Sequence, residues 1–370
     1  MSIYWLVDSY QAFPLLVKVL ISLCLLFTVL GITFFALSGY SRILASINNR
    51  RREKIKHRYI ELIIPLIFEE SGTKEAYDKA LHSFRKEFLG KRGRRQLLLN
   101  VLVEQHDDLS GEAAQRVRQV YIDLELFKDS FAKLKDYQWH IKVKGIRELA
   151  QMQVSEASKN IEGFIDSKNT ILAKEALLGL VQLREFKALA YINRYRYELS
   201  DWQMLSILEV LSSFDRENIP SFARWLDSEK NSMVIFCLRL IAVFHQREAE
   251  YQVVKLLENK ERSIRKEAVR TMRALQLNNH VDLIVGIYQT ETKDVRLEIL
   301  GAVGDLSMGE QKQFLEGEFL QPDFEISFAA AEALMKTSYN SKNDFKQLSA
   351  SFDETHTRII DHVTHEMLKS

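Results

Sequence analysis

The residues best suited to hold a metal ion lie near the end of this 370-residue chain. Asp361 and His365 are spaced i, i+4, as are His362 and Glu366, so each pair falls on one face of a helix. Carboxylate and imidazole groups at this spacing can bind a divalent cation. Pairs of this kind near a chain end are usually solvated surface groups. We therefore expect no metal site and no cofactor, and we expect residues 351–370 to form a C-terminal capping helix.

The sequence lacks the other arrangements that carry catalysis. It contains no Gly-x-Ser-x-Gly run, and no Cys/His pair or paired-carboxylate arrangement stands out. The two cysteines, Cys24 and Cys237, are too few for a disulfide framework or a tetrahedral zinc site. We predict no catalytic residue and no enzymatic activity. The alternative is an enzyme whose sparse site, with or without a metal, lies on the concave face of a helical array.

A basic segment in the first third of the chain suggests nucleic-acid binding. The stretch RKEFLGKRGRR, residues 85–95, holds six basic residues and one acid, with Phe88 as its single aromatic residue. Gly90 and Gly93 lack the strand, the spacing and the Lys-Ser/Thr ending of a phosphate-binding loop. The chain beyond residue 58 carries 43 basic and 48 acidic residues, so no positive background supports a nucleic-acid surface. We expect a solvated loop and no nucleic-acid partner.

An uncharged apolar run near the N-terminus is long enough to cross a bilayer. Residues 19–37 contain no charge, and with Leu15 to Lys18 they predict a transmembrane helix over 15–38. The positive-inside rule places the following basic flank in the cytoplasm and residues 1–14 outside, in a single-pass protein of the inner membrane. The alternative is a cleaved signal peptide ending near Ala36-Leu37-Ser38, although no positive charge precedes the run. The basic side chains expected to face anionic lipid headgroups are Arg50, Arg51, Arg52, Lys54, Lys56 and Arg58.

Residues 39–135 predict a juxtamembrane segment followed by a helical neck. The stretch YIELIIPLIFEE, residues 59–70, is too short for a second span, and its isoleucines fall on one helical face. Leu62 and Leu66 make its other side apolar, so we expect a buried helix, bent or restarted at Pro65.

An apolar skeleton returns about every 31 residues in the rest of the chain. Apolar residues recur at positions 0, +1, +4 and +7 of each copy, the spacing of one helical stripe. Each copy carries a second apolar group, so we expect antiparallel helical hairpins that bury their stripes against their neighbours. On this register Arg270 lies on the exposed side, and its removal would leave stability almost unchanged. The residues at position 0 are Gly145, Ala176, Ile207, Cys237, Ala268, Ile299 and Ala330.

The stretches 264–272 and 294–303 resemble HEAT-type repeats, specifically the short HEAT-like kind also found in phycobilisome lyases. The residues that carry the resemblance in the first stretch are Ile264, Arg265, Ala268 and Met272. It covers about residues 136–350 and implies an α-solenoid of about seven HEAT-like hairpins. The di-iron hydroxylases of this family use several His-Glu pairs, whereas this chain has only His365-Glu366. A tetratricopeptide array, with a period of about 34, fits less well.

Together these patterns predict an all-α protein, with one transmembrane helix followed by a neck and a solenoid. We expect a membrane-tethered scaffold or adaptor whose cytoplasmic solenoid binds a partner protein. The chain also resembles membrane-anchored bacterial HEAT-repeat proteins, which implies an accessory role for envelope or polysaccharide-synthesis machinery. Tyrosine and arginine often dominate interfaces, so the predicted docking residues are Arg194, Arg196 and Tyr197, in the stretch YINRYRYELSDW.

Overall fold

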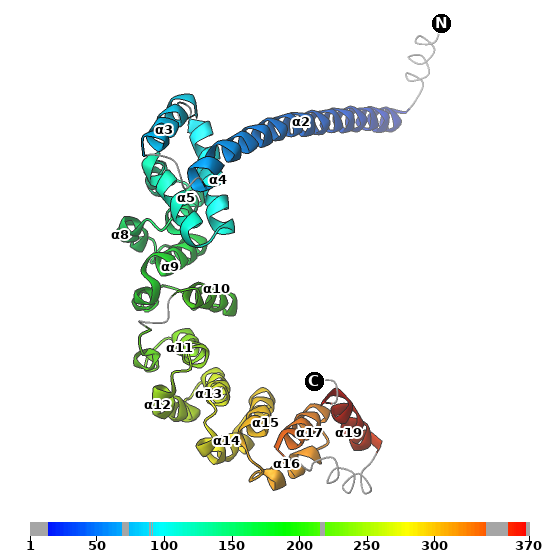
Figure 1. Cartoon of the computed structure of the whole chain (residues 1–370). Coiled ribbons are helices and arrows are strands. Elements are labelled where there is room, and N and C mark those ends of the chain that lie inside the picture. The colour runs from blue at the N-terminus through cyan, green and yellow to red at the C-terminus, as the bar shows by residue number, and fades with distance from the viewer. Residues whose placement is uncertain are drawn as a thin grey trace. The chain divides into compact units, whose positions relative to one another are not determined.

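The computed structural model describes residues 14–68, 74–88, 90, 92–214, 219–337 and 354–367 (Figure 1). All regular elements in these ranges are α-helices or short 3-10 helices, so the prediction of an all-α protein is confirmed. Residues 1–13, in the predicted outer tail, and residues 338–353, before the last helix, lie outside the described residues. The chain forms two compact units, residues 1–129 and 130–370, whereas the sequence places the border between neck and solenoid at 135.

The first unit is built on one long helix, α2 (Leu15–Phe68). Its 54 residues make it about 80 Å long. Residues Leu15–Ile43 are apolar and long enough to cross a membrane, and none of that apolar window is buried in the protein. Length and composition alone support this reading, and a signal sequence near an N-terminus has the same properties.

Helix α2 continues without a break from the apolar segment into the neck. The expected restart at Pro65 is wrong, because the helix runs through this residue to Phe68. A proline this close to the C-terminal end removes one backbone hydrogen bond from a long ladder. The guanidinium of Arg116 then donates to the carbonyl of Ile67 at 3.0 Å, which satisfies one of the open carbonyls at the helix end.

The end of α2 packs with α3 (Lys74–Phe88), α4 (Arg92–Asp108) and α5 (Gly111–Asp123). The expectation of a helix buried all round is wrong for this segment, since Leu62 and Ile64 are 39% and 45% exposed. The buried side of α2 is a narrow stripe at i, i+4 and i+8, and it meets apolar side chains of α3, α4 and α5. This core includes Tyr59, Ile63, Ile67, Leu81, Phe84, Leu98, Leu99, Leu102, Val117, Val120 and Tyr121.

The second unit is a stack of seven long helices, which confirms the prediction of an α-solenoid. Each long helix contains one predicted position-0 residue at a buried place, as the 31-residue period requires. The residues at +4 are likewise buried in all seven, so the predicted register holds. The long helices are α7 (Trp139–Gln151), α9 (Thr170–Arg184), α10 (Asp201–Ser212), α11 (Asn231–Val243), α13 (Arg262–Ala274), α15 (Lys293–Leu306) and α17 (Phe324–Thr337).

The second member of each hairpin is much shorter than the predicted antiparallel helix. Four contain one or two turns of α-helix, three of them beside 3-10 turns, whereas the described segments after α9 and after α10 are 3-10 helices. In Figure 1 the short helices α8, α12, α14 and α16 follow the outer side of an arc, and the long helices follow its inner side. The short segments described are η1 (Ser155–Ala157), α8 (Ser158–Glu162), η2 (Glu185–Tyr191), η4 (Phe222–Trp225), η5 (Arg247–Ala249), α12 (Glu250–Lys255), η6 (Leu256–Glu258), η7 (Asn278–His280), α14 (Val281–Ile287), η8 (Tyr288–Thr290) and α16 (Lys312–Phe319).

Two close approaches and one buried ion pair fix helix positions in the stack. A Cβ added to Gly304 in α15 would lie 2.7 Å from the Cα of Ala333 in α17, so the two backbones touch. A Cβ on Gly145 would similarly meet the carbonyl oxygen of Ser130 at 2.8 Å. Beside it, Lys133 of α6 (Phe127–Leu134) pairs with Glu148 at 2.5 Å, and both side chains are nearly buried.

A final helix, α19 (Glu354–Met367), lies next to α17 within the range predicted for a capping helix. Ile359, Ile360 and Val363 are buried, and the ring of His356 lies edge-on to Phe319 at 5.0 Å. The apolar end of the stack is therefore covered by this helix rather than by solvent.

Candidate protein-docking surface

The basic residues of α2 differ in how far they are available to lipid. Lys56 pairs with Glu104 of α4 at 2.7 Å, and this hydrogen bond raises the pKa of Lys56. Arg50 and Lys54 are exposed, whereas the side chains of Arg51 and Arg52 lie outside the described residues. Arg50 follows the apolar segment by seven residues, about 10 Å along the helix, and Arg58 lies about 12 Å further.

The basic segment 85–95 is partly neutralised within the first unit. Arg95 binds Asp129 through Nε at 2.8 Å, and Arg85 donates to the backbone carbonyl of Asp123. Tyr77 also donates to the Asp123 carboxylate at 2.9 Å, and burial raises the pKa of this tyrosine. These bases therefore tie helices together.

The three predicted docking residues lie between η2 and α10, and two of them bind within the chain. Arg194 pairs with Glu162 at 2.5 Å and lies 3.6 Å from Asp166. The hydroxyl of Tyr197 donates to the backbone carbonyl of Lys168 at 2.9 Å. Arg196 is exposed. Arg194 and Tyr197 thus join one repeat to the next, so their truncation is expected to affect stability as well as any docking.

The C-terminal candidates for metal binding are placed on α19. The ring of His362 lies 5.8 Å from that of Phe328, and the side chain of Glu366 is outside the described residues. Among the residues that the structure describes, no group of three or more His, Cys, Asp or Glu side chains is arranged to hold a metal ion.

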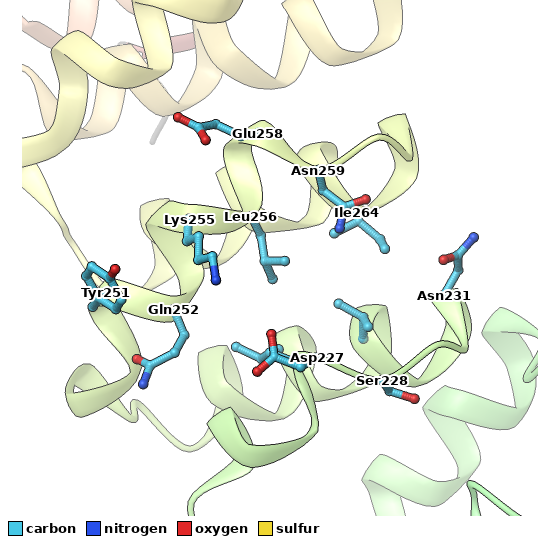
Figure 2. Close-up of a pocket in the computed structure, with 12 residues that line it drawn as sticks. Asp227, Ser228, Asn231, Tyr251, Gln252, Lys255, Leu256, Glu258, Asn259 and Ile264 are labelled. Atoms are coloured by element: carbon cyan, nitrogen blue, oxygen red, sulfur yellow. The ribbon is translucent and has the colours of Figure 1, made fainter.

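One open hollow of about 520 Å³ lies between η4 and the next hairpin (Figure 2). Leu256 and Ile264 point into it from one side and Asp227 from the other. The Asp227 and Lys255 side chains at its rim are exposed, so water already satisfies them. No buried polar atom in the described part of this hollow lacks a partner, and we assign it no ligand.

On the long helices, ion pairs link successive repeats in a regular pattern. An arginine at position +2 of one helix pairs with a glutamate at position −1 of the next, and this pattern occurs three times. The arginines are largely or partly exposed, whereas the side chains of Glu175, Glu267 and Glu298 are only 11% to 13% exposed. We call these pairs the ladder: Arg147–Glu175 at 2.5 Å, Arg239–Glu267 at 3.3 Å and Arg270–Glu298 at 2.6 Å.

The ladder changes the expectation for Arg270. The residue is exposed, as the register predicts, but its removal would leave the mostly buried Glu298 carboxylate without this partner. Arg273 would remain 4.0 Å from this carboxylate, so we expect a loss of about 1 kcal/mol, the lower end of the 1–3 kcal/mol that an unsatisfied buried acceptor costs.

The ladder is absent at three of the six junctions between the long helices: on both sides of α10, and between α15 and α17, where Gly301 and Ala329 stand at its positions. At α10 the residues at these positions are Leu178 with Ser206 and Glu209 with Phe236, and neither combination can form an ion pair. Within the described part of the chain, Glu209 forms no ion pair, although Asp201 at the start of α10 pairs with Arg239 at 2.8 Å. The uncompensated charge on α10 in the described part of the chain is therefore that of Glu209.

Large apolar side chains are exposed at the same place. Trp202 is 69% exposed and Leu205 54%, and they lie one turn apart on α10. Ile171, the equivalent of Trp202 on the neighbouring helix α9, is 46% exposed. The surface formed by Ile171, Lys174, Leu178, Trp202, Leu205 and Glu209 is called the α9–α10 surface below.

The local sequence fixes α10 in this position. Ser200 and Gln203 form a reciprocal capping box, in which the Gln203 side chain accepts from the Ser200 backbone at 3.0 Å. Met204, Ile207 and Leu211 are buried on the opposite side of the helix, against the stack. The side that carries the exposed tryptophan is therefore held toward solvent.

Sequence reasoning missed this surface because it followed the apolar columns at 0, +1, +4 and +7. Trp202 and Leu205 fall at −5 and −2, outside these columns. A tryptophan at −5, where the four later repeats carry serine, aspartate or glutamate, was the signal available in the sequence.

Among known proteins, only solved structures show similarity to this chain. No family model and no curated protein matches the sequence. Human deoxyhypusine hydroxylase in complex with glycerol is 14% identical over 79% of this chain and 98% of its own, with a TM-score of 0.30. Importin beta is 12% identical over 86% of this chain and 48% of its own, with a TM-score of 0.35.

The complex of CpcE and CpcF of phycocyanin lyase from Nostoc is 12% identical over 80% of this chain and 97% of its own, with a TM-score of 0.25. Similarity at these levels assigns neither an activity nor a partner to this chain. The all-α repeat solenoid is established by the chain's own helices and their period.

Proposed function

We propose that this protein is a membrane-tethered adaptor that binds a partner protein on the inner side of its solenoid and performs no chemistry itself. The observation that carries the proposal is the exposed α9–α10 surface, where tryptophan and leucine lie at a place that the ladder of ion pairs does not cover. Exposed aromatic side chains of this kind are typical of the centre of protein interfaces.

The tether in this proposal is α2. Its apolar segment would span the bilayer, and the same helix continues into the core of the first unit at Tyr59. The Arg50 to Arg58 segment would remain in the cytoplasm, with Arg50 and Lys54 nearest anionic headgroups. Holding a binding surface at a membrane raises the effective concentration of a partner there, which is the function of a scaffold. An accessory role for envelope or polysaccharide-synthesis machinery follows from the sequence resemblance alone.

The tether is tested by membrane extraction of the full chain with a C-terminal reporter. We expect the chain to resist alkaline carbonate and the reporter to be active only in the cytoplasm. Release by carbonate, or a reporter active outside, would show that α2 is no anchor or has the opposite orientation.

The adaptor role is tested on full-length protein isolated in mild detergent from its own host. We expect one protein partner in near-stoichiometric amount and no stoichiometric metal by elemental analysis. A bound metal in a one-to-one ratio together with no protein partner would favour an enzyme instead.

A further inference from the structure

The exposed residues of the α9–α10 surface also indicate which kind of partner segment would fit there. We propose that the partner segment is an amphipathic helix with an apolar stripe, a basic residue placed to meet Glu209 and an acidic residue placed to meet Lys174. This inference rests on the proposed adaptor function and specifies the site and the ligand class.

The first argument is the shape of the stripe. Ile171, Lys174 and Leu178 on α9 have the same spacing as Trp202, Leu205 and Glu209 on α10, namely i, i+3 and i+7. The second set follows the first by one 31-residue repeat, and α9 and α10 are in contact. Two neighbouring ridges of this length match the side-chain spacing of a third helix.

The second argument is the burial of the apolar members. Trp202 and Leu205 are more than half exposed, although the chain buries the large side chains of α10 on its opposite face. Ile171 is also exposed, on the helix that contacts α10, and a partner's leucine-type stripe would remove these three apolar side chains from water.

The third argument is charge. At three other junctions of the stack the ladder pairs an arginine at +2 with a glutamate at the next −1 position, but at α10 the +2 residue is a glutamate. Within the described residues neither Glu209 nor Lys174 forms an ion pair. Asp201 is already paired with Arg239, so its charge is less available to a partner. A partner with a lysine or arginine near Glu209 and an aspartate or glutamate near Lys174 would pair with both of these charges.

The inference is tested by selecting binders from a displayed library of 18-residue helical peptides. The target is the full-length protein in nanodiscs, and the Trp202→Ala/Leu205→Ala variant serves for counter-selection. We expect enriched peptides to share an aliphatic stripe flanked by a lysine or arginine. Selected peptides should bind the variant at least tenfold more weakly, because aromatic anchors dominate such interfaces.

The charge assignment is tested by Glu209→Lys, with Glu248→Lys as the matched reversal on the exposed outer segment η5. We expect Glu209→Lys to weaken the selected basic peptides about threefold to tenfold and to favour peptides in which glutamate replaces the basic residue. The Glu248→Lys protein should keep the wild-type preference.

Peptides without a basic bias, or equal binding by the wild type and Glu209→Lys, would overturn the proposed chemistry. The absence of any peptide that depends on Trp202 and Leu205 would overturn the site itself. A partner that still co-isolates with the Trp202→Ala/Leu205→Ala chain would refute this inference and leave the adaptor function standing, whereas no partner with the wild-type chain would refute the function.

Discussion

The stacking of the solenoid makes opposite predictions for two glycines on one helix. Gly301 and Gly304 both lie in α15, three residues apart. A Cβ on Gly304 would meet Ala333 of α17 at 2.7 Å (Cα) and 2.9 Å (Cβ), and these atoms move only if the α17 backbone moves. A Cβ on Gly301 would meet only Nη1 of Arg273 at 3.3 Å, at the flexible end of a side chain.

The magnitudes follow from two opposing effects. Alanine in place of glycine stabilises a helix interior by about 0.5–1 kcal/mol because less backbone entropy is lost on folding. Overpacking a tight contact costs about 1–3 kcal/mol. We therefore expect Gly304→Ala to destabilise the protein by about 0.5–2 kcal/mol, and Gly301→Ala to be neutral or to stabilise it by up to about 1 kcal/mol.

The assay combines urea denaturation of the full chain in detergent with amide hydrogen exchange. A stacked repeat protein can open locally, so exchange of peptides from α15 and α17 reports the affected seam directly. Faster exchange in both helices of Gly304→Ala, but not of Gly301→Ala, is the expected result. Equal effects of the two substitutions would show that α15 and α17 do not approach each other as described.

Three further predictions concern single positions. Gln276 follows the C-cap of α13 with a φ of 54°, a left-handed conformation that favours glycine, so Gln276→Gly should raise stability by about 0.5–1 kcal/mol in urea titrations, and a loss would refute the strain. Cys237 is fully buried and burial raises its thiol pKa, so in a Cys24→Ala chain it should resist alkylation at pH 8 until the protein is denatured; rapid reaction with folded protein would contradict its position. The buried hydroxyl of Tyr288 donates to Glu318 at 2.7 Å, so Tyr288→Phe should lower unfolding free energy by about 1–3 kcal/mol, and an unchanged midpoint would count against this bond.

The core of the solenoid could be predicted from the sequence because it depends on a repeated pattern. Ala176, Ala268 and Ala330 recur at one spacing, and each lies buried where a neighbouring helix packs. Helices of twelve or more residues contain enough apolar positions to fix a register. The short second members do not, since segments such as η2 (Glu185–Tyr191) have too few residues for a helical period to appear.

The candidate surface could not be predicted in the same way because it is a departure from the pattern. The meaning of Glu209 becomes clear only when Arg147, Arg239 and Arg270 are seen to pair across repeats at the equivalent position. Arg194 likewise looked free in the sequence, yet it binds Glu162 from the preceding repeat. Contacts between repeats are separated by about thirty residues, and a local reading of charge cannot show them.

Photo-crosslinking from position 202 in the full-length chain, in membranes of its own host, tests the central claim most directly. A crosslinking amino acid at Tyr251, which is 76% exposed near α12 on the outer side, is the control. The adaptor proposal predicts a single predominant protein adduct from position 202, found in the membrane fraction, and no such adduct from position 251. Equal adducts from both positions, or none from position 202 in a folded chain, would contradict the assignment of the inner side as the docking surface.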